Sequence, residues 1–260
     1  GLDTITIKTP DAAFAADLIV EGSALGSDTV DVTFNSTLAL SGENVTVSAT
    51  TVQVDTALST TGGGVISVTA TGNITVSSGA SITTVDGAMT LDGSGIVVDN
   101  ATLTAGSGAL TLIADTLALS NSPTLAGSDS LTIRPRTAGT TIGLGSGAGI
   151  LQLDATEVVS LADGFSSITI GDATAGTGAV DIASVTFLDP VTIVGGSLAV
   201  TGLTAADAGT PQAVTLTALN GSILDGGDVA TDVTGGLVTF NAALGGVGAT
   251  GDHLTLAADL

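Results

Sequence analysis

Short triplets in which an apolar residue alternates with a polar or small one recur along the chain. The stretch from Gly108 to Ile133 shows the pattern most clearly, because Leu110-Thr111-Leu112 and Leu117-Ala118-Leu119 are followed by Leu131-Thr132-Ile133, 21 residues after the first triplet. Alternation with a period of two residues is typical of a β-strand with one buried face. Its return at a nearly fixed spacing predicts a β-solenoid in which each repeat forms one coil.

The first triplet of each repeat can be followed through most of the sequence. Most neighbouring triplets are 20 to 24 residues apart, about the length of three short strands and three turns. We therefore expect an all-β parallel β-helix of roughly eleven coils, with about 20–24 residues in each coil. The triplets are Val45–Val47, Ile66–Val68, Met89–Leu91, Leu110–Leu112, Leu131–Ile133, Leu151–Leu153, Ile168–Ile170, Val191–Ile193, Val214–Leu216, Val238–Phe240 and Leu254–Leu256.

The outer two residues of each triplet are expected to face the core, and the middle residue to face the solvent. The middle residue is Thr in most repeats, as at Thr90, Thr111, Thr192 and Thr215, which predicts an outward column of hydroxyl groups. A flat Thr array can order water, but an ice-binding face needs a second Thr column beside the first. Two residues further along each strand the residue types are mixed, which favours an ordinary β-branched surface strand.

The spacing of the triplets also predicts how the chain is organised. Longer intervals after Leu131 and Ile168 predict loops that bulge from a corner of the coil. We expect a single β-solenoid domain over residues 1–260, with irregular first coils or a junction in 1–44 and regular coils in 45–260. Strand triplets close to both ends predict a segment of a longer chain, or a protomer that stacks head to tail with its neighbours.

The composition agrees with a packed β-protein. Hydrophobic residues make up 43% of the chain and the mean hydropathy is +0.61, whereas disordered chains lack the apolar surface that offsets backbone ordering. The 37 glycines fall mostly between triplets, where turns need them. No apolar run reaches the roughly 18–20 residues of a membrane-spanning helix, so membrane insertion is not expected.

The charge of the chain is strongly one-sided. Three Lys and Arg residues stand against 25 Asp and Glu residues, which gives a net charge of -22. Such a chain repels phosphate backbones and anionic lipid surfaces, so nucleic acid is not an expected partner. Divalent cations, by contrast, are suitable counter-ions. Cysteine is absent, which agrees with export as an unfolded chain.

Asp225, Asp228 and Asp232 are the candidate metal ligands. Ca²⁺ prefers several carboxylate and carbonyl oxygens, and these residues stand close together at an expected corner of a coil. Asp and Gly are also common turn formers, so a calcium site and a plain turn both stay open. No other cofactor is expected.

Other polar residues give weaker candidates. Arg134 and Arg136 flank Pro135, and they suit either an anion or sugar-acid site or pairing with neighbouring carboxylates. Asp172 and Asp181 offer a carboxylate pair of the kind that solenoid enzymes use to cleave polysaccharides. The chain has no Trp or Tyr to stack on sugars and few basic residues, so we expect no enzymatic activity and no catalytic residue.

Two stretches resemble a passage that recurs in very large bacterial surface proteins of the filamentous-haemagglutinin type. They are Leu131–Ile182, LTIRPRTAGTTIGLGSGAGILQLDATEVVSLADGFSSITIGDATAGTGAVDI, and Ala218–Leu256, ALNGSILDGGDVATDVTGGLVTFNAALGGVGATGDHLTL. The resemblance implies a right-handed parallel β-helix that is secreted to the extracellular space or the cell surface and works as an adhesin or fibre. Its expected partner is itself or a neighbouring solenoid segment. The alternative is a module that binds a glycan, a host surface or ice.

Overall fold

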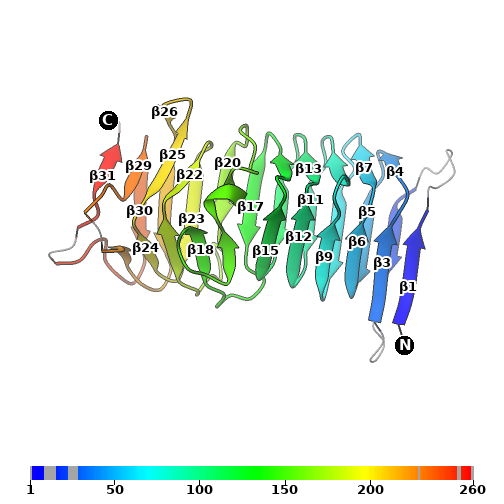
Figure 1. The fold of residues 1–260 in the computed structure, drawn as a ribbon, viewed down its shortest axis with the longest axis horizontal. Helices are drawn as coiled ribbons and strands as arrows, with labels where there is room; N and C mark the ends of the chain where they lie inside the picture. Colours follow the sequence, from blue (N-terminus) through cyan, green and yellow to red (C-terminus); the bar gives the residue numbers. More distant parts are fainter. Residues whose placement is uncertain (1, 9–15, 23–28, 228, 251–252, 259–260) are drawn as a thin grey trace. The chain divides into compact units, whose positions relative to one another are not determined.

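The computed structural model describes residues 2–8, 16–22, 29–227, 229–250 and 253–258. The chain is all-β, with parallel stacked strands that form a β-solenoid of about ten turns (Figure 1). The expected fold class is confirmed. The only helix in the described ranges is the short α1 (Ala155–Val158), and no helix there has the length and apolarity needed to cross a bilayer.

The chain divides into two compact units, residues 1–131 and residues 132–260, and each is described by itself. In the first unit each regular coil contributes one strand to each of three parallel sheets. The first sheet contains β1 (Leu2–Ile7), β3 (Thr29–Phe34), β6 (Thr51–Val54), β9 (Asn73–Val76), β12 (Gly95–Asp99) and β15 (Thr116–Ser120). The second contains β2 (Leu18–Glu21), β5 (Val45–Ala49), β8 (Ile66–Ala70), β11 (Met89–Asp92) and β14 (Leu110–Ile113). The third contains β4 (Leu38–Ser41), β7 (Ala57–Thr61), β10 (Ser81–Thr84), β13 (Thr102–Ala105) and β16 (Thr124–Ala126).

The second unit is also built from three sets of parallel strands, and β17 (Ser130–Arg134) spans the division between the units. The triplet strands are β20 (Ser167–Ile170), β23 (Val191–Gly195), β27 (Val214–Ala218) and β30 (Val238–Ala242). The fourth sheet has the order β19 (Leu151–Leu153), β18 (Ile142–Gly145), β21 (Val180–Ala183), β24 (Leu198–Val200) and β28 (Ile223–Asp225). The fifth contains β22 (Val185–Phe187), β25 (Leu203–Asp207), β29 (Val233–Gly235) and β31 (Leu256–Ala258), and β26 (Thr210–Pro211) pairs antiparallel with β25.

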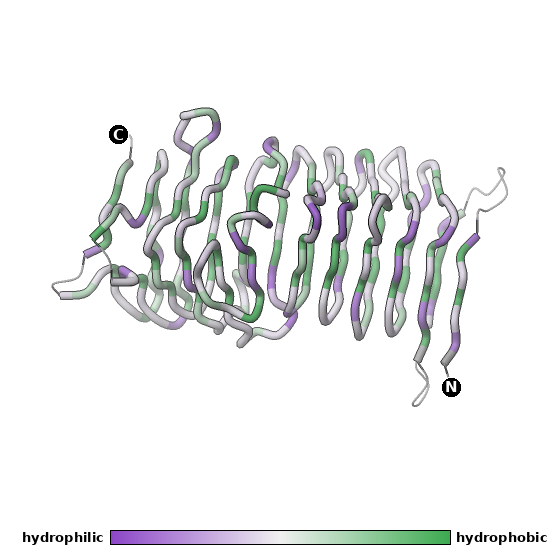
Figure 2. The backbone as a smooth tube through the Cα atoms, viewed as in Figure 1, coloured by the Kyte–Doolittle hydropathy of each residue, from purple (hydrophilic) through white to green (hydrophobic). Residues whose placement is uncertain are grey.

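The strands stack in register, so the side chains form columns. Val45, Ile66, Met89 and Leu110 are aligned on successive strands, and all four are fully buried. The middle residues of the same triplets face outward, which confirms the predicted assignment of inner and outer positions. Figure 2 shows the resulting alternation of apolar and polar residues along the coils.

Two of the expected first triplets belong to other sheets, so their assignment was wrong. Leu151–Leu153 forms β19, which pairs with β18, and the Leu254 triplet overlaps β31, which pairs with β29. Before residue 45, in contrast, β2 pairs with β5 in the register Leu18 to Val45 and forms a coil that the uneven spacing concealed. Alternation reports which face of a strand is buried, but it does not report which sheet the strand joins.

Several glycines are needed because successive coils lie very close together. A Cβ atom at Gly87 would lie 2.0 Å from the carbonyl oxygen of Gly64, and one at Gly108 would lie 2.1 Å from that of Gly87. Neither residue has a positive φ angle. The second unit repeats the feature, since a Cβ at Gly178 would lie 2.0 Å from the Thr140 oxygen. These glycines therefore provide close approach between backbones, in addition to the turns that the sequence predicted.

Candidate functional site

The least regular coil of the second unit, between residues 134 and 167, carries two inserted segments. The first, here called the flap, is the loop of residues 146–150 between β18 and β19. The second, here called the arm, comprises residues 154–166 and contains α1. Polar side chains and two cavities lie around the flap, the arm and the neighbouring loop of residues 171–179. These three segments together are the candidate functional site.

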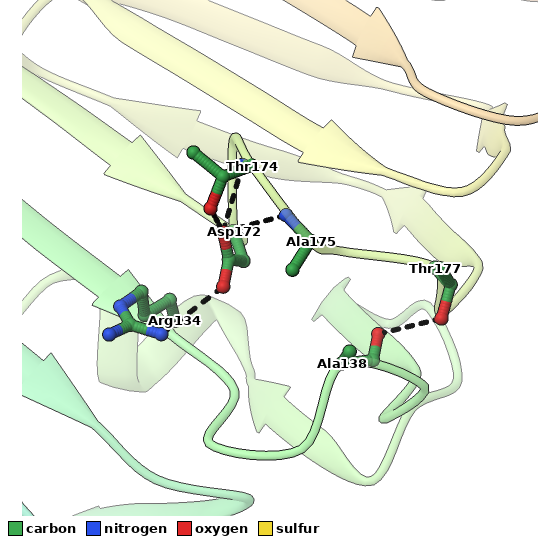
Figure 3. Close-up of polar contacts among 6 residues, drawn as sticks. All are labelled: Arg134, Ala138, Asp172, Thr174, Ala175 and Thr177. Carbon is green, nitrogen blue, oxygen red and sulfur yellow. Dashed lines mark hydrogen bonds and ion pairs between the residues drawn. The ribbon is translucent and has the colours of Figure 1, made fainter.

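Arg134 and Asp172 form an ion pair at the edge of this region (Figure 3). The Nη1 atom of Arg134 lies 3.2 Å from Oδ2 of Asp172, and the two side chains are 34% and 15% exposed. The Oδ1 atom of Asp172 accepts hydrogen bonds from the N–H and hydroxyl groups of Thr174 and from the N–H of Ala175. The Thr174 N–H is the main cause that lowers the pKa of Asp172, and the charge of Arg134 adds a smaller effect. Of the two interpretations of Arg134, pairing with a carboxylate is confirmed.

The two loops predicted after Leu131 and Ile168 are confirmed, and they lie against one another. The carbonyl oxygen of Ala138 accepts hydrogen bonds from the N–H and hydroxyl of Thr177, at 2.7 and 3.1 Å, and from the N–H of Gly178 (Figure 3). This contact joins segments that are 39 residues apart in the sequence. The two loops therefore form a hydrogen-bonded outer wall of this corner.

Asp181 holds the flap against the outer face of the fourth sheet. Its Oδ2 atom accepts a hydrogen bond of 2.8 Å from the N–H of Ala148. The flap lies directly on β18, because a Cβ atom at Gly149 would be 2.1 Å from the nitrogen of Gly143. Asp181 and Asp172 therefore engage different partners, and no described contact joins them. The geometry gives no support to the weak candidate of a carboxylate pair, in line with the expectation of no catalytic residue.

A groove of about 550 Å³ runs beside the flap. Small side chains line it, among them Ala179 and Ser197, which directly precede β21 and β24, and Ala199 of β24. Ile150 and Leu224 add apolar surface. Because the small residues leave space where the flap stands above the sheet, the groove offers backbone and aliphatic surface without a cluster of charges. It suits an extended chain or a flat apolar group.

The arm begins with a capping box. The Oδ1 atom of Asp154 accepts hydrogen bonds from the N–H groups of Thr156 and Glu157, and the Glu157 carboxylate accepts one from the N–H of Asp154. The hydroxyl of Thr156 is the main cause that lowers the pKa of Asp154. The sequence contains the matching signal, an Asp followed three residues later by Glu and then by Val158 and Val159. The signal is concealed by the triplet at Leu151, whose alternation indicates the start of a coil.

Asp189 binds the C-terminal part of the arm through a hydrogen bond. This residue is only 6% exposed, and its Oδ1 atom accepts a hydrogen bond of 3.1 Å from the N–H of Gly164. Its Oδ2 atom is buried and has no hydrogen-bond partner in the described ranges. Burial raises the pKa of Asp189, the N–H of Gly164 partly opposes this, and the negative charge of Asp163 adds to it. A buried carboxyl beside a second one was not detectable from the sequence.

Two of the three candidate calcium ligands have different hydrogen-bond partners. Asp228 lies outside the described residues. The Oδ1 atom of Asp225 accepts a hydrogen bond from the N–H of Gly227, as in a turn, while Oδ2 of the buried Asp232 accepts the N–H and hydroxyl of Thr255. Oδ1 of Asp232 is buried without a partner in the described ranges. No group of three or more His, Cys, Asp or Glu residues suited to a metal is found there, so the calcium site stays a prediction.

Hydroxyl groups form columns on two different faces. Thr169, Thr192, Thr215 and Thr239 are aligned on the triplet strands of the second unit. On the third sheet of the first unit two hydroxyl columns lie side by side, with Ser81 beside Thr83 on β10 and, in register, Thr102 beside Thr104 on β13. The triplet strands still have no second Thr column beside the first, and the paired hydroxyl columns cover only these two rows of a different sheet.

The inserted coil thus offers an ion pair, a hydrogen-bonded wall and two hollows lined by small or aliphatic side chains. Its carboxylates are mostly engaged by neighbouring N–H groups, so the arrangement suits binding at a surface better than bond-breaking chemistry. No known protein family, curated protein or solved structure matches this chain.

Proposed function

We propose that this chain is a structural or adhesive protein of the bacterial cell surface or extracellular space that forms a stiff β-solenoid rod or fibre. The observation that carries the proposal is the unbroken register of aliphatic columns within each unit. Val52, Ile74, Ile96 and Leu117 form one such column in the first unit, and Ile142, Val180, Leu198 and Ile223 form another in the second. Each coil is hydrogen-bonded to the next, so many weak contacts act together.

The outer surface supports the same function. Outward positions are mainly small or hydroxyl residues, which offer little chemistry but fit a flat β-surface. The net charge of -22 keeps such a surface soluble. The resemblance of residues 131–182 and 218–256 to proteins of the filamentous-haemagglutinin type agrees with secretion and with adhesion or fibre formation.

Stacking with a second copy or a neighbouring solenoid segment forms part of the proposal. Val214 and Leu216 of β27 are fully buried, whereas the aligned Val238 and Phe240 of β30 are only partly buried. A further coil laid against β30, the last strand of its sheet in the described ranges, would cover these apolar side chains and pair with the edge of the strand. The gain is about 25 cal/mol for each Å² of apolar surface that is removed from water.

Electron microscopy of the purified chain at increasing concentration tests the proposal. We expect rods that lengthen with concentration, and we expect Phe240→Asp to shorten them because it places a charge on the inner face of β30. Thr239→Asp is the matched control, since the neighbouring side chain faces outward. Short isolated rods at every concentration, or equal effects of the two variants, would contradict stacking.

A second candidate function is binding of ice or a glycan. The double hydroxyl column of Ser81, Thr83, Thr102 and Thr104 favours it, because a regular array of hydroxyls can hydrogen-bond either ordered water or sugar hydroxyls. A thermal-hysteresis assay and a glycan array test the two forms. Activity that is lost in Thr83→Val and kept in Thr192→Val would support this function, and inactivity in both assays would remove it.

A further inference from the structure

Five of the seven Asn residues of the chain stand in the pattern Asn-x-Ser or Asn-x-Thr. In this pattern, called a sequon, the side-chain amide of Asn can be joined to a sugar, and the middle residue can be any residue except Pro. Ser and Thr are common in this chain, so the pattern by itself does not select a site. The five sequons start at Asn35, Asn44, Asn73, Asn100 and Asn220.

In three of the sequons the hydroxyl residue belongs to a strand. Thr46, Thr75 and Thr102 are outward residues of β5, β9 and β13. Asn73 is itself the first residue of β9, and its Oδ1 atom accepts a hydrogen bond of 3.3 Å from the hydroxyl of Ser94. Because Asn is a common turn residue and Thr a common strand residue, the strand pattern explains these three sequons without a modification.

Two of these Asn side chains are also held by a neighbouring coil through the amide nitrogen. The Nδ2 atom of Asn44 donates a hydrogen bond to Asp17, while its Oδ1 atom accepts one from the N–H of Val65. The Nδ2 atom of Asn100 donates to the hydroxyl of Ser78 at 3.0 Å. A sugar on either nitrogen would compete with a contact between coils.

The other two sequons lie wholly in connections between strands. Residues 35–37 join β3 to β4, and residues 220–222 lie between β27 and β28. Asn35 and Asn220 are exposed, and no hydrogen bond donated by the amide nitrogen of either residue is found in the described ranges. A sugar on either nitrogen therefore displaces no described contact of the fold.

The hydroxyl groups of these two sequons differ in their surroundings. Thr37 is exposed, and its side chain makes no hydrogen bond within the part of the chain that the structure describes. The Oγ atom of Ser222, in contrast, accepts a hydrogen bond of 3.1 Å from the N–H of Gly246. The sequon of Asn35 is therefore the more open of the two, and we expect it to be the more completely modified.

We propose that Asn35 and Asn220 carry N-linked sugars, a modification that goes beyond the structural or adhesive function and does not require stacking. The sugar donor is a glycosyl diphosphate. The Nδ2 atom forms a bond to C1 of the sugar, and the bond between C1 and the diphosphate oxygen breaks, so that its electron pair leaves with the diphosphate. One amide proton is released in the same reaction, which needs no oxidant or reductant. Asn44 stays unmodified because its amide nitrogen is bonded to Asp17.

Mass spectrometry of the chain purified from the cells that produce it tests the proposal. Three Lys and Arg residues leave trypsin few sites, so thermolysin is the suitable protease, and electron-transfer fragmentation keeps a sugar on its residue. We expect the mass of at least one sugar on Asn35 and on Asn220, and none on Asn44. Absence of sugar from both Asn35 and Asn220, sugar on Ser or Thr residues only, or equal occupancy of Asn44 would overturn the proposal.

Variants of the first sequon locate the requirement. Asn35→Gln and Thr37→Val should each remove the sugar at position 35 and leave the sugar on Asn220 unchanged. Thr37→Ser should retain it because the hydroxyl is kept, and Ser36→Ala is the matched control because the middle residue of a sequon is free to vary. The three positions are exposed or half-buried, so circular dichroism spectra should not change. Sugar retained in Thr37→Val, or lost in Ser36→Ala, would show that the sequon does not direct the modification.

Discussion

The backbone at Gly87 lies so close to Gly64 of the preceding coil that a Cβ atom on Gly87 would be 2.0 Å from the Gly64 carbonyl oxygen. No methyl group fits at that distance, so Gly87→Ala must push the two coils apart. We expect a loss of about 1–3 kcal/mol in the free energy of unfolding, measured by urea denaturation. Gly139→Ala is the control, because its nearest neighbour would be 3.8 Å away, and it should change stability by less than about 0.5 kcal/mol. Equal losses of unfolding free energy in the two variants would mean that the close approach of the coils does not require a glycine at position 87.

Leu112 and Thr111 test the inner and outer faces of one triplet. Leu112 is 1% exposed, whereas Thr111 faces outward. Leu112→Asp would bury a charge without a partner, and we expect a loss of at least about 3 kcal/mol and a clear fall in the melting temperature. Thr111→Ser should change stability by less than about 1 kcal/mol. Similar melting temperatures of the two variants would refute the assignment of faces.

The triplets were sufficient to predict the fold class, because burial of one strand face leaves a two-residue period in the sequence. At Leu110 and Leu112 this period identifies both the strand and its inner side chains. At Leu151 the same pattern is present, but β19 pairs with β18 in a different sheet. Register depends on backbone pairing between distant segments, and a local pattern carries no information about it.

The candidate site was less predictable for a similar reason. Loops after Arg134 and Ile170 follow from their Gly, Ala and Thr content, and the structure has them there. The burial of Asp189, in contrast, depends on the arm, whose Gly164 is 25 residues earlier in the chain. The capping box of Asp154 and Glu157 was the available local signal for the arm, but nothing local to Asp189 indicates that its carboxyl is buried.

Calcium binding at Asp225, Asp228 and Asp232 remains to be tested by calorimetry. If the site exists, Ca²⁺ should release or absorb heat and raise the melting temperature, because binding to the folded state alone stabilises it. Asp232→Asn should abolish the heat, since Oδ1 of Asp232 is the buried oxygen without a partner in the described ranges. If the unmodified chain shows no heat of Ca²⁺ binding, or if this variant shows the same heat, only the interpretation as a turn remains.

Asp172 should stabilise the second unit above acidic pH. Its pKa lies below the ordinary value of 3.8, chiefly because the Thr174 N–H stabilises the carboxylate. The folded state therefore holds this proton less tightly than the unfolded chain. The stabilisation is present above pH 3.8 and is lost as the pH falls through the lowered pKa. Asp172→Asn should cost about 1 kcal/mol at pH 7, reduced by partial solvent screening, and less in acid.

Arg134→Gln separates the ion pair from the hydrogen bonds. Because the Arg134 charge is the smallest of the causes that act on Asp172, this variant should cost less stability at pH 7 than Asp172→Asn. Urea denaturation of both variants at pH 7 and in acid measures the difference. A larger loss for Arg134→Gln would mean that the ion pair, and not the Thr174 turn, holds the loop.

Asp189 should have the opposite dependence on pH. Burial raises its pKa above 3.8, so the folded state holds the proton more tightly than the unfolded chain does. Its contribution to stability is then complete below pH 3.8 and is lost as the pH rises through the raised pKa. Once it is ionised, the carboxylate is buried beside the negative charge of Asp163, which destabilises the attachment of the arm.

Asp189→Asn removes this penalty. The amide oxygen can still accept the hydrogen bond from the Gly164 N–H, while the charge is gone. We expect the variant to be more stable than the unmodified chain by about 0.5–2 kcal/mol at pH 7, with the difference shrinking in acid. Asp163→Asn should give a smaller gain, because it removes only the neighbouring charge, and the double variant should gain less than the sum of the two. A loss of stability in Asp189→Asn at pH 7 would show that the charged carboxylate itself holds the arm in place.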